Sequence, residues 1–174
     1  KGQNPQVMVI SCCDSRVDPA QIFDTHPGEI FVVRNVANLV PPFENNTGKH
    51  GVSAALEFGI MHLNIPEILV LGHGQCGGVK AALARHDGAD AGGIFIDQWI
   101  GMLDHACARV ADNPDAEAAL ELETVRVSLA NLRTFPFIAE REAAGGLTLH
   151  GAHFTIRTGV LQILDNKTDE FFQA

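Results

Sequence analysis

The sequence predicts an α/β domain with a mainly parallel central sheet, flanking helices and an antiparallel edge strand. Three observations predict it: short continuous apolar runs typical of buried strands, a helical repeat between two of these runs, and a tail in which apolar residues alternate. A chain of 174 residues has the length of one ordinary domain. We therefore expect a single domain over residues 1–174.

The first half of the chain carries the strand and crossover signals. Val7–Ile10 is a continuous apolar run after Pro5, as expected of a strand buried on both faces, and Ile30–Val33 and Ile68–Leu71 have the same character. Between the second and third runs, apolar residues recur at helical spacing over 51–63. A helix between two buried strands predicts a parallel crossover.

The second half changes its apolar period. The expected elements are a glycine-rich turn over 72–78, a helix over 79–85, a loop over 86–93, helices over 94–143 broken at Asn113–Pro114 and Pro136, and two strands over 147–156 and 160–164. The last two strands are joined by a turn near Gly159, which predicts an antiparallel pair at the edge of the sheet.

Charge and cysteine content limit the possible partners and compartments. Twelve Lys and Arg against 21 Asp and Glu give a net charge of -9, the wrong sign for neutralising phosphates, so we expect neither nucleic acid nor membrane as a partner. The sequence begins at Lys1 with no pattern typical of a signal peptide, which we interpret as a trimmed N-terminus. Four cysteines are too few for a disulfide framework, and they favour a cytoplasmic location.

Reactive side chains follow two of the predicted strands. The segment 11–16, Ser-Cys-Cys-Asp-Ser-Arg, comes after the first strand, and the segment 72–78, Gly-His-Gly-Gln-Cys-Gly-Gly, comes after the third. Ligand sites in open parallel sheets lie beyond the carboxyl ends of strands, where the strand order reverses. We expect the two loops to face one crevice.

Thiolate and imidazole are typical zinc ligands, and the short spacing of His73 and Cys76 lets both bind one ion. A cysteine of the first loop would be a third ligand, which leaves the fourth tetrahedral position for water or substrate, as in catalytic zinc sites. An isolated H-x-x-C also occurs by chance, and buried free cysteine is common. Spacing alone therefore leaves a zinc site and plain core packing open.

The two loops together resemble the signature of the β-class carbonic anhydrases. The resemblance rests on Cys12-x-Asp14-Ser15-Arg16 and His73-x-x-Cys76-Gly77-Gly78, and it extends to 29–38 and 149–151. It implies a zinc enzyme that interconverts carbon dioxide and bicarbonate, assembled as a dimer or a dimer of dimers with active sites at the dimer interface. Members usually carry helices before the first strand that embrace the partner, and we expect this chain to lack that arm.

The resemblance also implies roles for individual residues. It makes Cys12, His73 and Cys76 the ligands of one Zn²⁺, makes Asp14 and Arg16 the paired acid and base, and leaves Cys13 at a variable position. The residues it implies for substrate binding are Gln3, Phe31, Val36, Phe58 and Gly77. In plant-like members the equivalent of Phe58 is often Tyr and comes from the neighbouring subunit, so a hydroxyl is missing here while the apolar wall remains.

Elementary chemistry explains why these residue types are needed. Zinc lowers the pKa of water to roughly 7. Two thiolates cancel the formal charge of the ion, so this site should acidify water less than one built from three imidazoles. Asp14 is expected to accept a hydrogen bond from the attacking oxygen, and Arg16 to hold Asp14 ionised through a bidentate pair.

Three other functions are considered. Relatives of this fold hydrolyse carbonyl sulfide or carbon disulfide, and spacing does not distinguish these substrates. A non-catalytic zinc-bound assembly protein is a second alternative, against which the intact Asp14–Arg16 pair argues. A cysteine-dependent phosphatase is set aside because its loop needs a longer spacing than that between Cys12 and Arg16.

The resemblance also bears on the state of the site. Some bacterial members close it by moving the equivalent of Asp14 onto zinc, coupled to bicarbonate in a second pocket that requires a Trp three residues before the first cysteine ligand. Here that residue is Val9, although Arg34 matches another residue of the pocket. We therefore expect an open site near neutral pH, with Asp14 paired to Arg16.

Overall fold

The computed structural model describes residues 2–46, 48–90 and 92–174, and a six-stranded sheet of order β2-β1-β3-β4-β5-β6 forms its centre. The strands are β1 (Val7–Cys12), β2 (Ile30–Asn35), β3 (Glu67–His73), β4 (Thr148–Thr155), β5 (Val160–Asp165) and β6 (Glu170–Gln173). The pairs β1–β2, β1–β3 and β3–β4 are parallel, and β4–β5 and β5–β6 are antiparallel. The predicted fold class is confirmed.

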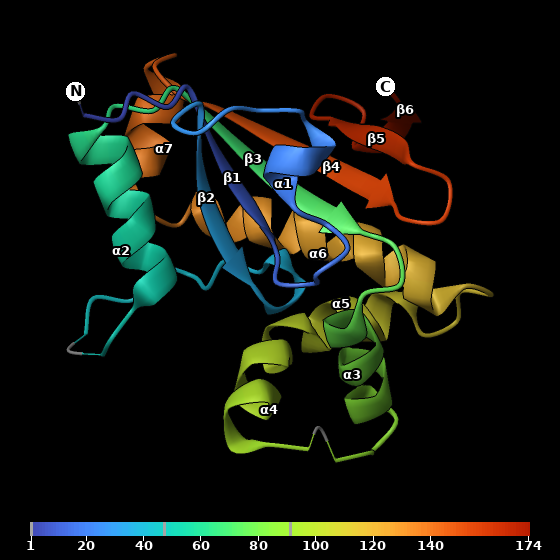
Figure 1. Cartoon of the computed structure of the whole chain (residues 1–174). Helices are drawn as coiled ribbons and strands as arrows, with labels where there is room; N and C mark the ends of the chain where they lie inside the picture. The colour runs from blue at the N-terminus through green and yellow to red at the C-terminus, as the bar shows by residue number, and fades with distance from the viewer. Residues whose placement is uncertain (1, 47, 91) are drawn as a thin grey trace.

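Helices lie on both faces of the sheet and beyond one of its ends. They are α1 (Pro19–Ile22), α2 (Gly51–Glu57), α3 (Gly77–His86), α4 (Ile94–Ile100), α5 (Asp104–Val110), α6 (Ala116–Leu132) and α7 (Pro136–Ala143), with short 3-10 turns η1 (Val36–Asn38) and η3 (Gly101–Leu103) and a π-turn η2 (Phe58–His62) that continues α2. Figure 1 shows α6 behind the sheet, α1 in front, and α3, α4 and α5 beyond the ends of β1 and β3. None of the helices in the described ranges is long and apolar enough to cross a membrane.

The central strands are buried on both faces, as predicted. Met8 and Ile10 of β1 belong to the core beneath α6 and α7, while Val9 packs on the opposite face with Leu71 and Ala152. Alternate residues of a strand point to opposite faces, so this division requires a strand with apolar residues throughout.

The same prediction is wrong for β2. This strand is at the edge of the sheet, its residues are only partly buried, and Val32 is 39% exposed. A run of apolar residues predicts a strand but does not tell whether the strand is central or at the edge of the sheet. β2 is at the edge and pairs only with β1.

The tail contains one more strand than expected. The predicted pair is confirmed as β4 and β5, but β6 follows and forms the edge. Only Phe171 and Phe172 mark β6 in the sequence, and they stand among polar residues in a strand too short for a clear alternation.

Two glycines let α6 approach the sheet closely. A Cβ at Gly72 would lie 2.8 Å from Val125 Cγ2, and a Cβ at Gly151 would lie 2.7 Å from Val125 Cγ1. Real side chains do not tolerate such distances, so α6 packs directly on the backbone of β3 and β4. This contact brings Glu121, one turn before Val125, against the loop that follows β3.

Candidate metal centre

The ends of β1 and β3 bring Cys12, His73 and Cys76 together. Cys12 ends β1, His73 ends β3, and Cys76 precedes the first residue of α3. All three are buried, and their ligand atoms lie within 4.8 Å of one another. The two sulfurs are 3.9 Å apart, close to the roughly 3.8 Å expected for two thiolates bound tetrahedrally to one zinc ion.

The ring of His73 is oriented for metal binding. Its Nδ1 is 2.9 Å from the carbonyl oxygen of Gly74 and donates to it, which leaves Nε2 as an acceptor. Nε2 is buried and has no hydrogen-bond partner among the described residues. Buried polar atoms are normally paired. A bare ring nitrogen beside two sulfurs fits a metal ion, so this donor set suits zinc.

The two thiols of the cluster titrate as a pair. A hydrogen bond between the sulfurs lowers the pKa of Cys12 to about 4 and raises the pKa of Cys76. The pairing therefore favours ionisation of Cys12 over Cys76. A bound cation would deprotonate both thiols, because metal ligands bind in their deprotonated form.

Asp14 and Arg16 form a bidentate ion pair beside the cluster. Arg16 Nε donates to Asp14 Oδ1 over 2.9 Å, and Nη2 donates to Oδ2 over 2.7 Å. These hydrogen bonds hold the pKa of Asp14 well below its usual value. Arg16 Nη2 also reaches the carbonyl oxygen of Gln75 over 3.2 Å, which connects the two loops. The pairing expected for an open site is present.

Arg34 donates hydrogen bonds to the backbone of the first loop. Its Nε donates to the carbonyl oxygen of Cys12 over 2.9 Å, and its Nη2 to that of Asp14 over 2.7 Å. Its Nη1 forms an ion pair with Asp18 at 3.4 Å. Sequence reasoning noted Arg34 only as the remnant of a second pocket, and its contact with the loop backbone had no signal in the sequence.

Two of the residues expected to bind substrate lie near the cluster. Val36 follows Asn35, which is the register partner of Cys12. A Cβ at Gly78 would lie 2.6 Å from Val36 Cγ1, so the start of α3 packs directly against this side chain. Gly77 is the first residue of α3 and follows Cys76.

The other three expected residues lie elsewhere in the chain. Phe31 is the register partner of Met8, which places it about 13 Å along the strand from the level of Cys12. Phe58 stacks against Phe31, with ring centroids 6.3 Å apart. Gln3 is exposed and precedes β1. A single chain does not bring these three side chains to the metal cluster.

Comparison with known proteins agrees with this site. The family model described as carbonic anhydrase matches residues 7–161. Beta carbonic anhydrase 3 of Arabidopsis thaliana is 40% identical over 181 residues, which cover 99% of this chain and 70% of the plant protein. The chain belongs to the β-class carbonic anhydrase family. Enzymes of this class use zinc, and the cluster of Cys12, His73 and Cys76 can hold the ion.

Solved β-carbonic anhydrases share the fold. The structure of the β-carbonic anhydrase CcaA superposes with a TM-score of 0.91 at 32% identity, covering 99% of this chain and 85% of that one. One of two tetrameric β-carbonic anhydrases from the filamentous ascomycete Sordaria macrospora gives a TM-score of 0.79 at 30% identity, covering 94% of this chain and 82% of that one.

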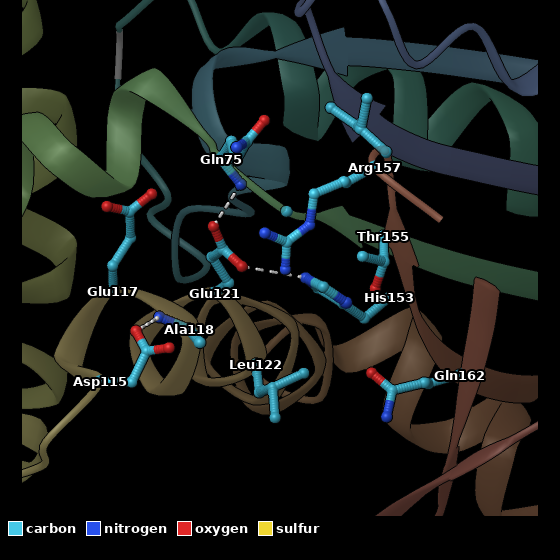
Figure 2. Close-up of a pocket in the computed structure, with 12 residues that line it drawn as sticks. Gln75, Asp115, Glu117, Ala118, Glu121, Leu122, His153, Thr155, Arg157 and Gln162 are labelled. Atoms are coloured by element: carbon cyan, nitrogen blue, oxygen red, sulfur yellow. Dashed lines mark hydrogen bonds and ion pairs between the residues drawn. The ribbon is translucent and has the colours of Figure 1, made fainter. Parts of the chain in front are cut away.

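Sequence reasoning missed a buried polar pair behind the metal loop. Glu121 and His153 are each 5% exposed, and His153 Nε2 lies 3.3 Å from Glu121 Oε2. Figure 2 shows Glu121 on α6 between the backbone of Gln75 and the His153 ring. A signal was available, because Glu121 is an acidic residue between apolar positions of α6, beside Leu120 and one turn before Val125.

Proposed function

We propose that this β-class carbonic anhydrase catalyses the reversible hydration of carbon dioxide to bicarbonate and a proton, with one Zn²⁺ held by Cys12, His73 and Cys76. The observation that carries the proposal is the buried Nε2 of His73, unpaired among the described residues and beside two cysteine sulfurs 3.9 Å apart. Bound there, zinc would act as a Lewis acid that lowers the pKa of water and so would supply a nucleophile.

The catalytic pair acts through one oriented carboxylate. Asp14 accepts a hydrogen bond from the attacking oxygen and directs its lone pair toward carbon dioxide. Arg16 keeps Asp14 ionised and fixes its plane, because the guanidinium binds both carboxylate oxygens. Arg34 holds the backbone of Cys12 and Asp14 and so keeps the carboxylate at a constant place relative to the cluster.

Carbon dioxide is uncharged, so an apolar wall with a few donors is sufficient to place it. Val36 supplies such a wall, and the amide of Gly77, at the start of α3, supplies a donor. We propose that Phe31, Phe58 and Gln3 complete the pocket of a second copy of the chain, since they lie away from the cluster of their own chain.

This arrangement requires a homo-oligomer, either a dimer or a dimer of dimers. The turn that follows α2 exposes the apolar side chains of Phe58, at 47%, and Met61, at 55%. Val32 of the edge strand β2 is 39% exposed. Burial of exposed apolar side chains such as these favours association. The tetrameric relatives from Sordaria macrospora support the same proposal.

We also propose that residues 1–174 act as one domain around the six-stranded sheet and that the protein works in the cytoplasm. All four cysteines are free thiols, and a site that needs two thiolates favours a reducing compartment. Fractionation of the source cells with an antibody to the chain would test the location, and recovery with an extracellular or membrane fraction would contradict it.

The test of the function is a stopped-flow assay of carbon dioxide hydration on a sample whose zinc content is measured in parallel. We expect about one zinc per chain and activity proportional to zinc. Carbonyl sulfide and carbon disulfide hydrolysis are measured on the same sample. Hydrolysis of either sulfide without carbon dioxide hydration would overturn the proposed substrate, and zinc without any of the three activities would indicate an assembly protein.

A further inference from the structure

The loop that carries two of the three cluster residues contains an unusual backbone conformation. Gln75, between His73 and Cys76, has a φ of 59°. Residues other than glycine rarely adopt this left-handed region, because the Cβ atom crowds the following carbonyl oxygen. A fixed contact must therefore hold the turn.

That contact is the carboxylate of Glu121. The amide of Gln75 donates to Glu121 Oε1 over 2.5 Å, and the amide of Cys76 approaches the same oxygen at 3.4 Å. Successive backbone amides around a left-handed residue form a concavity that binds anions. Here the anion is a side chain of the same protein, reaching the turn from α6 (Figure 2).

Glu121 is itself held from two other sides. Its second oxygen lies 3.3 Å from His153 Nε2, and both side chains are at most 7% exposed. Its backbone lies close to β3, because a Cβ at Gly72 would be 3.4 Å from the carbonyl oxygen of Glu121 and 2.8 Å from Val125 Cγ2. A buried carboxylate is costly unless it is paired, and this one is paired on both oxygens.

We propose that Glu121 is a positioning residue for the metal centre: its carboxylate fixes the Gln75 turn so that His73 and Cys76 reach one zinc ion together. The inference rests on the proposed zinc site and adds a residue that does not touch the ion. Outer contacts of this kind determine how tightly a ligand set holds its metal.

A cavity of about 390 Å³ lies beside the Gln75 turn and the Glu121 carboxylate. Its lining includes Gln75, Glu121, His153 and Arg157. Water in this cavity could replace the lost acceptor, so the chain can still fold. A mobile water does not fix the turn, and the turn would loosen.

Three variants of the zinc-loaded protein separate positioning from general stability. Glu121→Met fills the same space without an acceptor, and Glu121→Gln keeps an oxygen that can accept from the Gln75 amide. The matched control is Ser128→Ala, which removes a buried hydroxyl of the same helix that accepts from the Val40 amide and donates to the Asn38 carbonyl oxygen.

The readouts are the rate of zinc transfer to excess dipicolinate and the thiolate charge-transfer spectrum of the cobalt-substituted protein. We expect Glu121→Met to lose zinc about 10- to 100-fold faster than wild type and to shift the cobalt spectrum. Glu121→Gln should restore both properties to near the wild-type values. Ser128→Ala should lower the thermal midpoint while zinc transfer and the spectrum stay unchanged.

Wild-type zinc transfer and an unchanged spectrum in Glu121→Met would overturn the proposal. So would equal acceleration in Ser128→Ala, because zinc loss would then follow overall stability. If Glu121→Met does not fold, amide exchange in the wild-type protein decides. Slow exchange at Gln75 and Cys76 that persists after zinc is removed supports a turn held by Glu121, and rapid exchange contradicts it. A wild-type protein that holds no zinc would refute the proposed function, while the exchange measurement would still report on Glu121.

Discussion

The guanidinium of Arg16 donates to both carboxylate oxygens of Asp14, at 2.9 and 2.7 Å, and the Arg16 amide adds a third hydrogen bond at 3.0 Å to Oδ1. Three donors converge on a group two residues away. The carboxylate is thereby restricted to one plane and to its ionised form, which is the form that can only accept hydrogen bonds.

Asp14→Asn is expected to keep zinc and to lose about 100-fold or more of its hydration activity, the range typical of a lost acid–base group. The amide nitrogen cannot accept from Arg16, so the pairing and the orientation are both lost. Stopped-flow hydration and zinc content are the measurements. Asp115→Asn is the control, because Asp115 caps α6 through the Ala118 amide at 3.1 Å and Asn caps helices equally well. Near-normal turnover in Asp14→Asn would contradict the role.

The lowered pKa of Asp14 gives a pH prediction. A carboxyl whose folded pKa is depressed stabilises the protein fully above its unfolded pKa, and the stabilisation is lost as pH falls through the folded value. The difference in thermal midpoint between wild type and Asp14→Asn should therefore stay constant from about pH 8 to pH 5 and shrink only below the ordinary value of 3.8. A difference that disappears between about pH 8 and pH 6, at equal zinc content, would show that Asp14 titrates much higher.

Cys76→Ala should lose zinc and hydration activity together. Two soft ligands would remain, and a tetrahedral zinc site with an open position needs three. Cys107→Ala is the matched control, since Cys107 is also buried but belongs to α5 and packs among apolar residues. Metal analysis after dialysis is the measurement. Zinc retained in full by Cys76→Ala would remove this residue from the site.

The two sequence loops could be predicted to meet because strand ends of a parallel sheet share one edge. That rule leaves the third ligand open between Cys12 and Cys13, and the resemblance to the β-class carbonic anhydrases selects Cys12. The contacts that support the two loops could not be predicted. Arg34 reaches the backbone of the first loop, and Glu121 reaches that of the second, from elements distant in sequence. Such contacts depend on how closely helices approach the sheet, which Gly72 and Gly151 set through packing that no local pattern encodes.

The exposed aromatic ring of Phe58 leads to a prediction on assembly. Phe58→Asp should dissociate the oligomer and remove most activity, because a charge would be buried at the proposed interface and an aromatic wall would be lost from the partner's pocket. Phe95→Asp is the control, since Phe95 is 88% exposed on α4. Sedimentation at the assay concentration is the measurement. A fully active wild-type monomer would refute the shared pocket.

The last prediction concerns bicarbonate as a regulator. A closed state would need a second bicarbonate pocket, and two observations argue against one here. Val9 is 1% exposed and packs with Leu71 and Ala152, so it offers neither a polar donor nor free space. The guanidinium of Arg34 already binds the carbonyl oxygens of Cys12 and Asp14.

Without tighter binding to a closed state, bicarbonate cannot shift the equilibrium toward it. We therefore expect inhibition by bicarbonate at neutral pH to follow a simple binding curve, with a Hill coefficient of about 1. A crystal structure of the zinc protein grown with bicarbonate near pH 7 should keep Asp14 on Arg16. An Asp14 oxygen within roughly 2.0 to 2.2 Å of zinc, the usual carboxylate distance, would show that this chain closes its site without the tryptophan pocket.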